Sequence, residues 1–305
     1  MATTTSGMRS QRKALELLRG GKMPDAFLRR RIADVKRTMT ARFQEKEAID
    51  KQYARYWGQI HKAPKTDPGP RVTQAMNGLL GIHKKLARNK LTPPEILGGI
   101  GGVLAGRFGA TVVPPFDYAF TIPFLNYGNP SLTGSANKNT GQISGSAVSD
   151  FQAASFGTMY TEMGIYFHPI FGPANLYVSA HPAFSIEWWT NSLFADSTVV
   201  SLGEGALGIY AQQGEIGPST GGFAPFDSWD EEMTQQVRFD FGSNPHIPVA
   251  VEAQVDPSFN CAIFVSTVNH VQNVGWPGSL AGSMMSVTLP SITFELDLIQ
   301  VANPG

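Results

Sequence analysis

The sequence predicts an α+β protein with segregated elements: a basic, coiled-coil-like helical region at 1–113, then an acidic antiparallel β-sandwich, jelly-roll-like, at 114–305. The charge predicts this division first, because the first region holds 22 basic and 8 acidic residues and the second holds 2 basic and 16 acidic residues. The hydrophobic periodicity also changes near the same boundary, from a helical spacing to alternation. Glycine and proline concentrate in the second region, as in proteins of many short strands joined by tight turns.

The composition, 42% hydrophobic and 16% charged over 305 residues, is that of a folded protein with room for two domains. Cys261 is the only cysteine, so no intrachain disulfide can form. The basic N-terminus has no apolar stretch behind it, and no uncharged apolar run reaches the roughly 18 residues of a membrane span. We therefore expect no signal peptide, and a protein that is cytoplasmic or is released or assembled without standard secretion.

A long helix is expected at about 24–58, where Pro24 suits a first helical turn. From Leu28 onward, apolar residues recur with alternating spacings of four and three, the pattern of a coiled-coil seam with a basic interruption. Phe43 lies one position off this seam and can carry it through the interruption. The residues predicted to mediate oligomerisation are Leu28, Ile32, Val35, Met39, Ile49 and Tyr53.

The stretch 62–70 is a proline-rich break, and a weaker helix is expected at 71–89. A glycine-lined segment follows at 96–113, in which Gly98, Gly102 and Gly106 recur every four residues. Such a face lets two backbones approach closely, so an oligomerising or membrane-inserting segment is one interpretation. A glycine-rich connector is favoured instead, because glycine disfavours helix and the uncharged run is short.

Beyond Pro114 the hydrophobic residues alternate, as in strands with one buried face. With no helical pattern between them, about ten short strands predict an antiparallel sandwich, with one solvated face on each sheet. The expected strands are 116–124, 159–167, 174–180, 183–189, 198–211, 235–241, 247–255, 259–266, 284–289 and 292–299.

A resemblance accompanies this pattern in the motifs PPFDYAF, NKNTGQ, GIYFHPIF, LYVSAHPAF, GALGIY and SVTLPSITFEL. The region 114–298 resembles the C-terminal β-domain of a group of uncharacterised bacterial proteins that carry a coiled-coil-prone N-terminal segment. The motifs are structural, so the resemblance implies a fold and no activity. The helical part departs from that group, because it is more basic and has fewer heptads.

No catalytic constellation is found. The G-x-S-x-G match around Ser219 lies in a glycine-rich stretch, whereas a reactive nucleophile elbow needs a strand before it and a helix after it. Cys261 alternates with apolar neighbours and is expected in the core. His168 and His181 stand in similar contexts and are expected to be structural rather than metal ligands. We therefore expect no enzyme activity, no cofactor and no metal.

The stretch 226–232 is the strongest candidate for ligand binding, as an acidic loop with an exposed tryptophan. A tryptophan ring can stack on a sugar while carboxylates accept hydroxyl hydrogen bonds, but a plain loop or calcium ligands would have the same composition. Two adjacent tryptophans elsewhere require one ring to face outward, which favours an aromatic recognition surface. The candidate residues are Trp229, Asp227, Asp230, Glu231, Trp188 and Trp189.

Basic residues on the long helix have two interpretations. They could neutralise phosphates of nucleic acid or of anionic lipid. Acidic residues are interspersed among them, however, which favours a solvated or partner-facing surface. These residues are Arg29, Arg30, Arg31, Lys36 and Arg37.

The leading hypothesis is a non-enzymatic oligomeric assembly or recognition protein, whose helical region assembles and whose sandwich binds a surface or a ligand such as a glycan. The alternatives are a virion-type shell protein with a nucleic-acid-facing arm, a membrane-active toxin with a receptor-binding sandwich, and an enzyme acting on polysaccharide. The opposite charges make the protein itself the preferred partner, through contact of the helical and β regions within or between chains.

Overall fold

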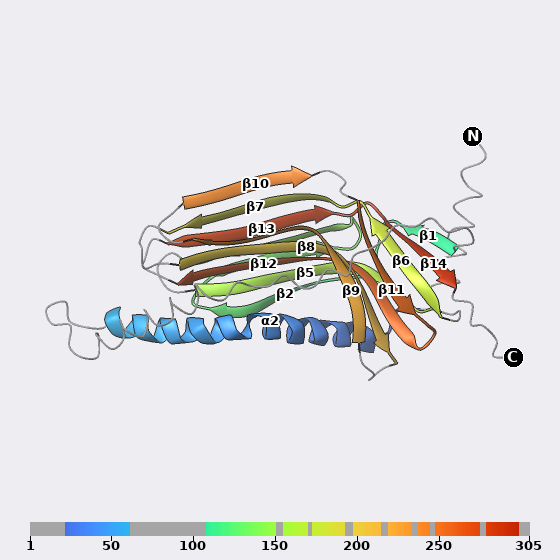
Figure 1. The fold of residues 1–305 in the computed structure, drawn as a ribbon, viewed down its shortest axis with the longest axis horizontal. Helices are drawn as coiled ribbons and strands as arrows, with labels where there is room; N and C mark the ends of the chain where they lie inside the picture. The colour runs from blue at the N-terminus through green and yellow to red at the C-terminus, as the bar shows by residue number, and fades with distance from the viewer. Residues whose placement is uncertain are drawn as a thin grey trace.

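The computed structural model describes residues 22–61, 108–150, 155–169, 173–192, 198–214, 219–233, 237–244, 248–274 and 279–298. Within these ranges the chain forms fourteen strands and one long helix (Figure 1). Every strand pairing is antiparallel. The predicted division into a helical segment and an antiparallel β-sandwich is therefore confirmed.

The strands form three sheets. The helix-facing sheet has the order β2 (Tyr118–Tyr127), β5 (Ser155–Phe167), β12 (Phe259–Val274), β8 (Thr198–Gln213) and β9 (Ser219–Met233). The second sheet has the order β10 (Val237–Asn244), β7 (Ala183–Asn191), β13 (Leu280–Thr288), β4 (Gln142–Val148) and β3 (Ser131–Asn137). The third has the order β1 (Phe108–Val112), β14 (Ile292–Leu298), β6 (Ala174–Ala180) and β11 (Val249–Val255).

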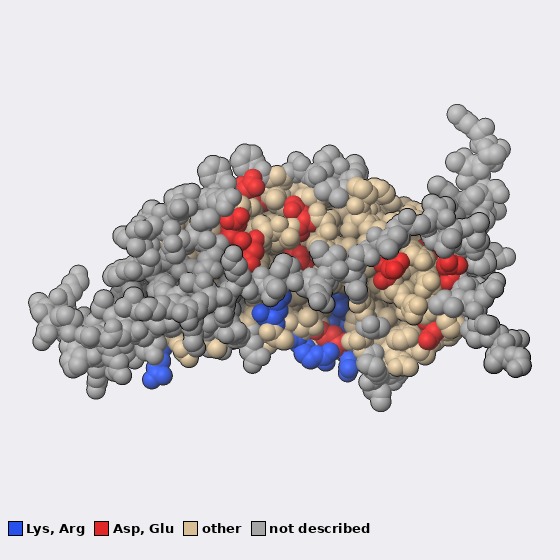
Figure 2. All heavy atoms as spheres, viewed as in Figure 1, with Lys and Arg blue, Asp and Glu red and all other residues tan. Residues whose placement is uncertain are grey.

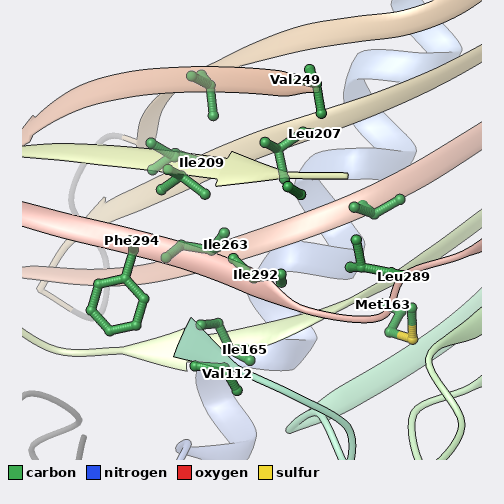
Figure 3. Close-up of a cluster of buried hydrophobic side chains, with 14 of the residues drawn as sticks. Val112, Met163, Ile165, Leu207, Ile209, Val249, Ile263, Leu289, Ile292 and Phe294 are labelled. Carbon is green, nitrogen blue, oxygen red and sulfur yellow. The ribbon is translucent and has the colours of Figure 1, made fainter. Parts of the chain in front are cut away.

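The main hydrophobic core lies between the helix-facing sheet and the other two (Figure 3). Met163 and Ile165 of β5 and Ile263 of β12 are fully buried there, and they meet Phe294 and Ile292 from β14. These side chains occupy alternate positions of their strands, because successive side chains of a strand point to opposite faces. Alternation therefore identified the inner faces correctly.

The prediction of one solvated face on each sheet is wrong for the helix-facing sheet. All thirteen residues of β5 are buried, so both faces of this strand are covered. The inner face meets the main core, and helix α2 (Asp25–His61) packs on the outer face, against β2, β5 and β12. A sheet face that lies under an amphipathic helix is withdrawn from water like the inner one.

Helix α2 agrees closely with the expected helix at 24–58. Its first turn begins at Pro24, whose carbonyl oxygen accepts from the backbone N–H of Phe27 at 3.0 Å. The helix runs along the outer face of the sheet, and its C-terminal end extends past the ends of the strands (Figure 1). No helix in the described ranges is long and apolar enough to span a membrane.

The boundary between helical and β regions needs correction. Residues 108–112, expected within the glycine-lined segment, form strand β1 and pair with β14, from Phe108 opposite Leu296 to Val112 opposite Ile292. The break at 62–70, the helix at 71–89 and Gly98, Gly102 and Gly106 lie outside the described residues.

Candidate functional site

The apolar seam of α2 packs on the chain's own β-sheet. Val35 and Phe43 are buried against Ile122 and Phe124 of β2 and Leu202 of β8, with Ile32 and Met39 beside them. The seam is predicted to mediate oligomerisation, whereas in this structure the outer face of the chain's own sheet covers its first part. Ile49 and Tyr53 lie on α2, but their side chains are outside the described part of the molecule.

The start of the helix is anchored by aromatic contacts. Phe27 is buried and lies edge-on to Tyr166, with ring centroids 5.1 Å apart, and Leu28 packs beside it. Farther along, the Phe43 ring stacks on His270 of β12 at 4.5 Å and 15°. As the seam predicts, Phe43 is fully buried. Two aromatic anchors about four turns apart fix the position of α2 along the sheet.

Between these anchors, Arg31 enters a polar socket in the sheet. Its guanidinium donates from Nε to Glu162 Oε1 at 3.0 Å and from Nη2 to Oε2 at 2.8 Å. Tyr118 donates to Glu162 Oε1 at 2.8 Å, and Tyr160 donates to Oε2. The socket around Glu162 is therefore a bidentate ion pair whose carboxylate has four donors, the geometry that guanidinium groups favour.

Two aromatic rings complete the socket. The Arg31 guanidinium carbon lies 4.7 Å from the ring centre of Tyr210 and 4.3 Å from that of Phe264, within the range of cation–π attraction. Burial alone would lower the pKa of Arg31, but the Glu162 carboxylate outweighs it and holds this pKa above its ordinary value. Burial and the adjacent carboxylate raise the pKa values of Tyr118 and Tyr160. Both tyrosines therefore stay protonated and remain donors to Glu162.

Two further polar links join the helix to the sheet. Arg42 Nη2 lies 3.1 Å from Glu204 Oε2 of β8. Tyr210 donates to Asp34 Oδ2 at 2.6 Å, while Arg37 lies 2.7 Å from Asp34 Oδ1. Burial would raise the pKa of Asp34, but the Tyr210 hydrogen bond and the Arg37 charge lower it below its ordinary value. The Arg31–Glu162 and Arg42–Glu204 pairs thus join basic residues of the helical region to acidic residues of the β region within one chain, whereas Asp34 is an acidic residue of the helix itself.

A groove of about 420 Å³ lies between α2 and the sheet. Small residues of the sheet, Ala206, Ser219, Gly221 and Gly222, leave this space under the helix. Asp34 and Glu204, the carboxylates of the two polar links, both line the groove. The helix therefore does not pack tightly on the sheet along its whole length.

The five candidate basic residues of the helix differ in exposure. Arg29, Lys36 and Arg37 are exposed, as expected of a solvated or partner-facing surface. Arg30 is partly exposed and lies 3.6 Å from Asp34. Arg31 departs from the prediction, because its side chain is only 11% exposed and belongs to the socket.

The acidic stretch 226–232 is not a loop but part of strand β9, which pairs with β8 along its length except for a register shift at Phe226. The prediction of an exposed tryptophan is wrong, because Trp229 is 8% exposed, packs across Gly203 in the main core and donates from Nε1 to Ser201 at 3.0 Å. The Trp229 ring is therefore not accessible for stacking on a sugar. Asp230 is exposed, and Asp227 and Glu231 are partly exposed.

The adjacent tryptophans of β7 do not form a broad aromatic surface. Trp188 is buried in the main core, and Trp189 is partly buried and packs across Gly282 of the neighbouring strand. Only one ring faces outward, as expected, but it lies against Gly282, where a Cβ atom would clash with the ring. The predicted recognition surface is therefore reduced to one partly covered ring.

The remaining chemical candidates have structural positions. Ser219 begins strand β9 and lines the groove. Cys261 is fully buried, and burial raises the pKa of its thiol to about 12. His181 is exposed, and a ring nitrogen of His168 lies 3.1 Å from the carbonyl oxygen of Phe259. Across the described residues, no group of three or more histidine, cysteine or acidic side chains could hold a metal ion.

Sequence reasoning missed the socket. Its signal is present in β5, where Tyr160, Glu162 and Tyr166 occupy the alternate positions to Met163 and Ile165. A carboxylate between tyrosines on the second face of an apolar strand predicts a buried charge that needs a cation. The matching cation is one of nine basic residues of the helix, so composition alone does not single it out.

Comparisons with known proteins show no family. No protein-family model matches the chain, and no curated protein matches it. Solved structures with some likeness include infectious bursal disease virus strain Gx, with 10% identity and a TM-score of 0.18 over 66% of this chain and 42% of the other. Tailspike protein 4 of bacteriophage CBA120 has 13% identity and a TM-score of 0.15, over 62% of this chain and 19% of the other.

An isomalto-dextranase of Arthrobacter globiformis T6, in complex with panose, has 9% identity and a TM-score of 0.14 over 62% of this chain and 35% of the other. The chain thus spans less than half the length of each of these three proteins. Their TM-scores are too low to carry an argument about function.

Proposed function

We propose that this protein is a non-enzymatic assembly protein whose copies associate through oppositely charged surfaces. The observation that carries the proposal is the charge that remains after the helix has docked. Arg31 and Arg42 are paired with the sheet, but Lys22, Arg29 and Lys36 are exposed along the helical segment. Docking of α2 therefore does not neutralise the basic region.

The exposed basic residues form a stripe on α2, which we call the basic stripe. Lys22, Arg29 and Lys36 are seven residues apart, so Arg29 and Lys36 share one face of the helix and Lys22 continues that line just before it. Most of the acidic side chains visible in Figure 2 lie over the β-sheets, whereas the visible basic side chains follow the edge at α2. The exposed acids of the sheets include Glu187 on β7 and Asp240 on the neighbouring strand β10.

Such surfaces favour contact between the basic stripe of one copy and the acidic strands of another. One exposed ion pair contributes about 0–1 kcal/mol, so several must form together. Exposed charges are screened over about 10 Å at 0.1 M salt and about 3 Å at 1 M. The association is therefore expected at low salt and is weakened at high salt.

Light scattering after size-exclusion chromatography tests the proposal at these two salt concentrations. We expect a mass well above the 33.0 kDa of one chain at 0.1 M salt, and a lower mass at 1 M. Arg29→Glu together with Lys36→Glu should abolish the association at low salt. Lys138→Glu is the matched control, because Lys138 is an exposed basic residue of the β region.

A mass of 33.0 kDa at both salts would overturn the proposal. So would nucleic acid that copurifies with the chain and is released by the stripe variant, since the basic stripe would then serve a phosphate backbone. The ratio of absorbance at nucleic-acid and protein wavelengths separates these outcomes.

A further inference from the structure

Helix α2 is an added element on a complete set of sheets. In the described structure it contributes no strand pairing. Its side chains hold it through apolar and aromatic contacts, through the socket around Glu162, and through the Arg42–Glu204 and Asp34–Tyr210 links. The groove of about 420 Å³ beneath it shows that contact is incomplete between these points. The surface that receives α2 is thus a separate binding site on the β region.

This site recognises one helix in one position. Burying a charge pair costs desolvation free energy that the attraction only roughly repays, so the socket adds little net affinity. What it does add is geometry, because the two parallel hydrogen bonds from Arg31 to Glu162 form only when the guanidinium enters between the rings of Tyr210 and Phe264. The occupant must therefore carry an arginine at the position of Arg31, between the aromatic anchors.

The chain supplies that occupant, and a second copy supplies an identical one. Helix α2 ends at His61 and the first described strand begins at Phe108, so residues 62–107 separate the helix from the β region in sequence. About 46 residues can span at most about 150 Å, which exceeds the size of a domain. Chain length therefore does not restrict α2 to its own β region.

We propose that α2 is exchanged between copies, so that the helix of one chain occupies the binding site of another and the exchange is reciprocal. The proposal rests on the self-association described above and names the contact that completes it. Exchange of an identical element creates no new interface, since every contact of α2 is the same within and between chains. The equilibrium between exchanged and unexchanged helices depends on the local concentration of copies. Charge-driven association raises that concentration.

Charge reversal of one link distinguishes exchange from docking within one chain. We choose Arg42 and Glu204, whose side chains are 18% and 12% exposed, because reversal there leaves the buried socket intact. In Arg42→Glu chains, and in Glu204→Arg chains, like charges meet at this link in every arrangement. In an equimolar mixture, opposite charges meet only when each chain receives the helix of the other variant.

We expect native mass spectrometry of the mixture to show more heterodimer than either homodimer, each at about twice the 33.0 kDa chain mass, because only the exchanged heterodimer brings opposite charges together at both links. Proteolysis of α2 should be fast in each variant and slow again in the mixture. The double variant Arg42→Glu/Glu204→Arg tests whether the reversed pair is tolerated, because it restores opposite charges within one chain. Lys138→Glu mixed with Glu252→Arg is the control for charge alone, since both residues are exposed and away from this link.

Exchange is overturned if the double variant regains protection of α2 but the mixture does not, or if a heterodimer forms without that protection. If the wild type still shows salt-dependent association in that case, only the exchange fails and the proposed function stands. If the wild type is a monomer at both salts, the proposed function and the exchange both fail, because reciprocal exchange requires at least two associated chains.

Discussion

Replacement of Glu162 by glutamine tests the socket most directly. Glutamine has nearly the same shape, but it removes the negative charge and replaces one acceptor oxygen with an amide that donates. Arg31 would then be a buried charge without its counter-ion, and one of the donors from Arg31 or Tyr160 would face another donor. Breaking a buried ion pair by changing one partner typically costs about 3–5 kcal/mol.

The lower end of this range applies, because Arg31 can return to water when α2 leaves the sheet. A loss of about 3 kcal/mol corresponds to a decrease in Tm of about 6–12 °C for a domain of this size. Thermal unfolding measures the decrease, and hydrogen exchange of the α2 amides shows whether the helix is released first. Glu252→Gln is the control, since Glu252 is exposed on β11 and its replacement should change the free energy of unfolding by less than about 0.5 kcal/mol.

A second variant separates loss of the charge pair from general damage. Arg31→Met combined with Glu162→Gln removes the buried cation as well, and it leaves the glutamine oxygen as an acceptor for Tyr118. This double variant should be more stable than Glu162→Gln alone, because no uncompensated charge remains buried. A Glu162→Gln protein with the Tm and helix protection of the wild type would refute the reasoning, as would a double variant less stable than the single one.

Two further predictions concern titration. The Cys261 thiol, fully buried with a pKa of about 12, should not react with thiol reagents at pH 8 until denaturant unfolds the chain; rapid labelling of the native protein would contradict its position. The pKa of Asp34 is lowered because the Tyr210 hydrogen bond and the Arg37 charge outweigh its burial. The ionised Asp34 therefore stabilises the folded protein fully above its ordinary pKa of 3.8, and this stabilisation is lost as the pH falls through the lower pKa of the folded state. The stability difference between wild type and Asp34→Asn, measured by urea unfolding from neutral to acidic pH, should therefore shrink toward zero at the acidic end.

The elements of the fold could be predicted where one periodicity dominated. Strand β6 has the predicted bounds of 174–180, and α2 lies within three residues of the expected helix ends. Strands β3, with the sequence SLTGSAN, and β4, with the sequence QISGSAV, were missed because small and polar residues give alternation too little contrast. Strand β9 was missed because its glycines and acidic residues resemble those of a loop.

The candidate site could be predicted only in part, for a physical reason. The seam of α2 is correct as a pattern of buried residues, but a pattern does not specify the surface that buries it. Trp229 shows the converse problem, because a polar sequence context suggests exposure while Gly203 on the neighbouring strand gives the ring a buried position. Contacts between strands distant in sequence decide both outcomes.

The charge division between the two regions is only partly accounted for by contacts within the chain. Part of it acts within the chain, where Arg31 and Arg42 meet Glu162 and Glu204 and fix the position of α2. These pairs use only two of the basic residues, and the basic stripe remains exposed. Docking of α2 on its own sheet needs only the basic residues that pair with acids of that sheet. It does not require the exposed basic residues of the stripe. The excess charge is therefore the observation on which the proposed association with another copy of the chain rests.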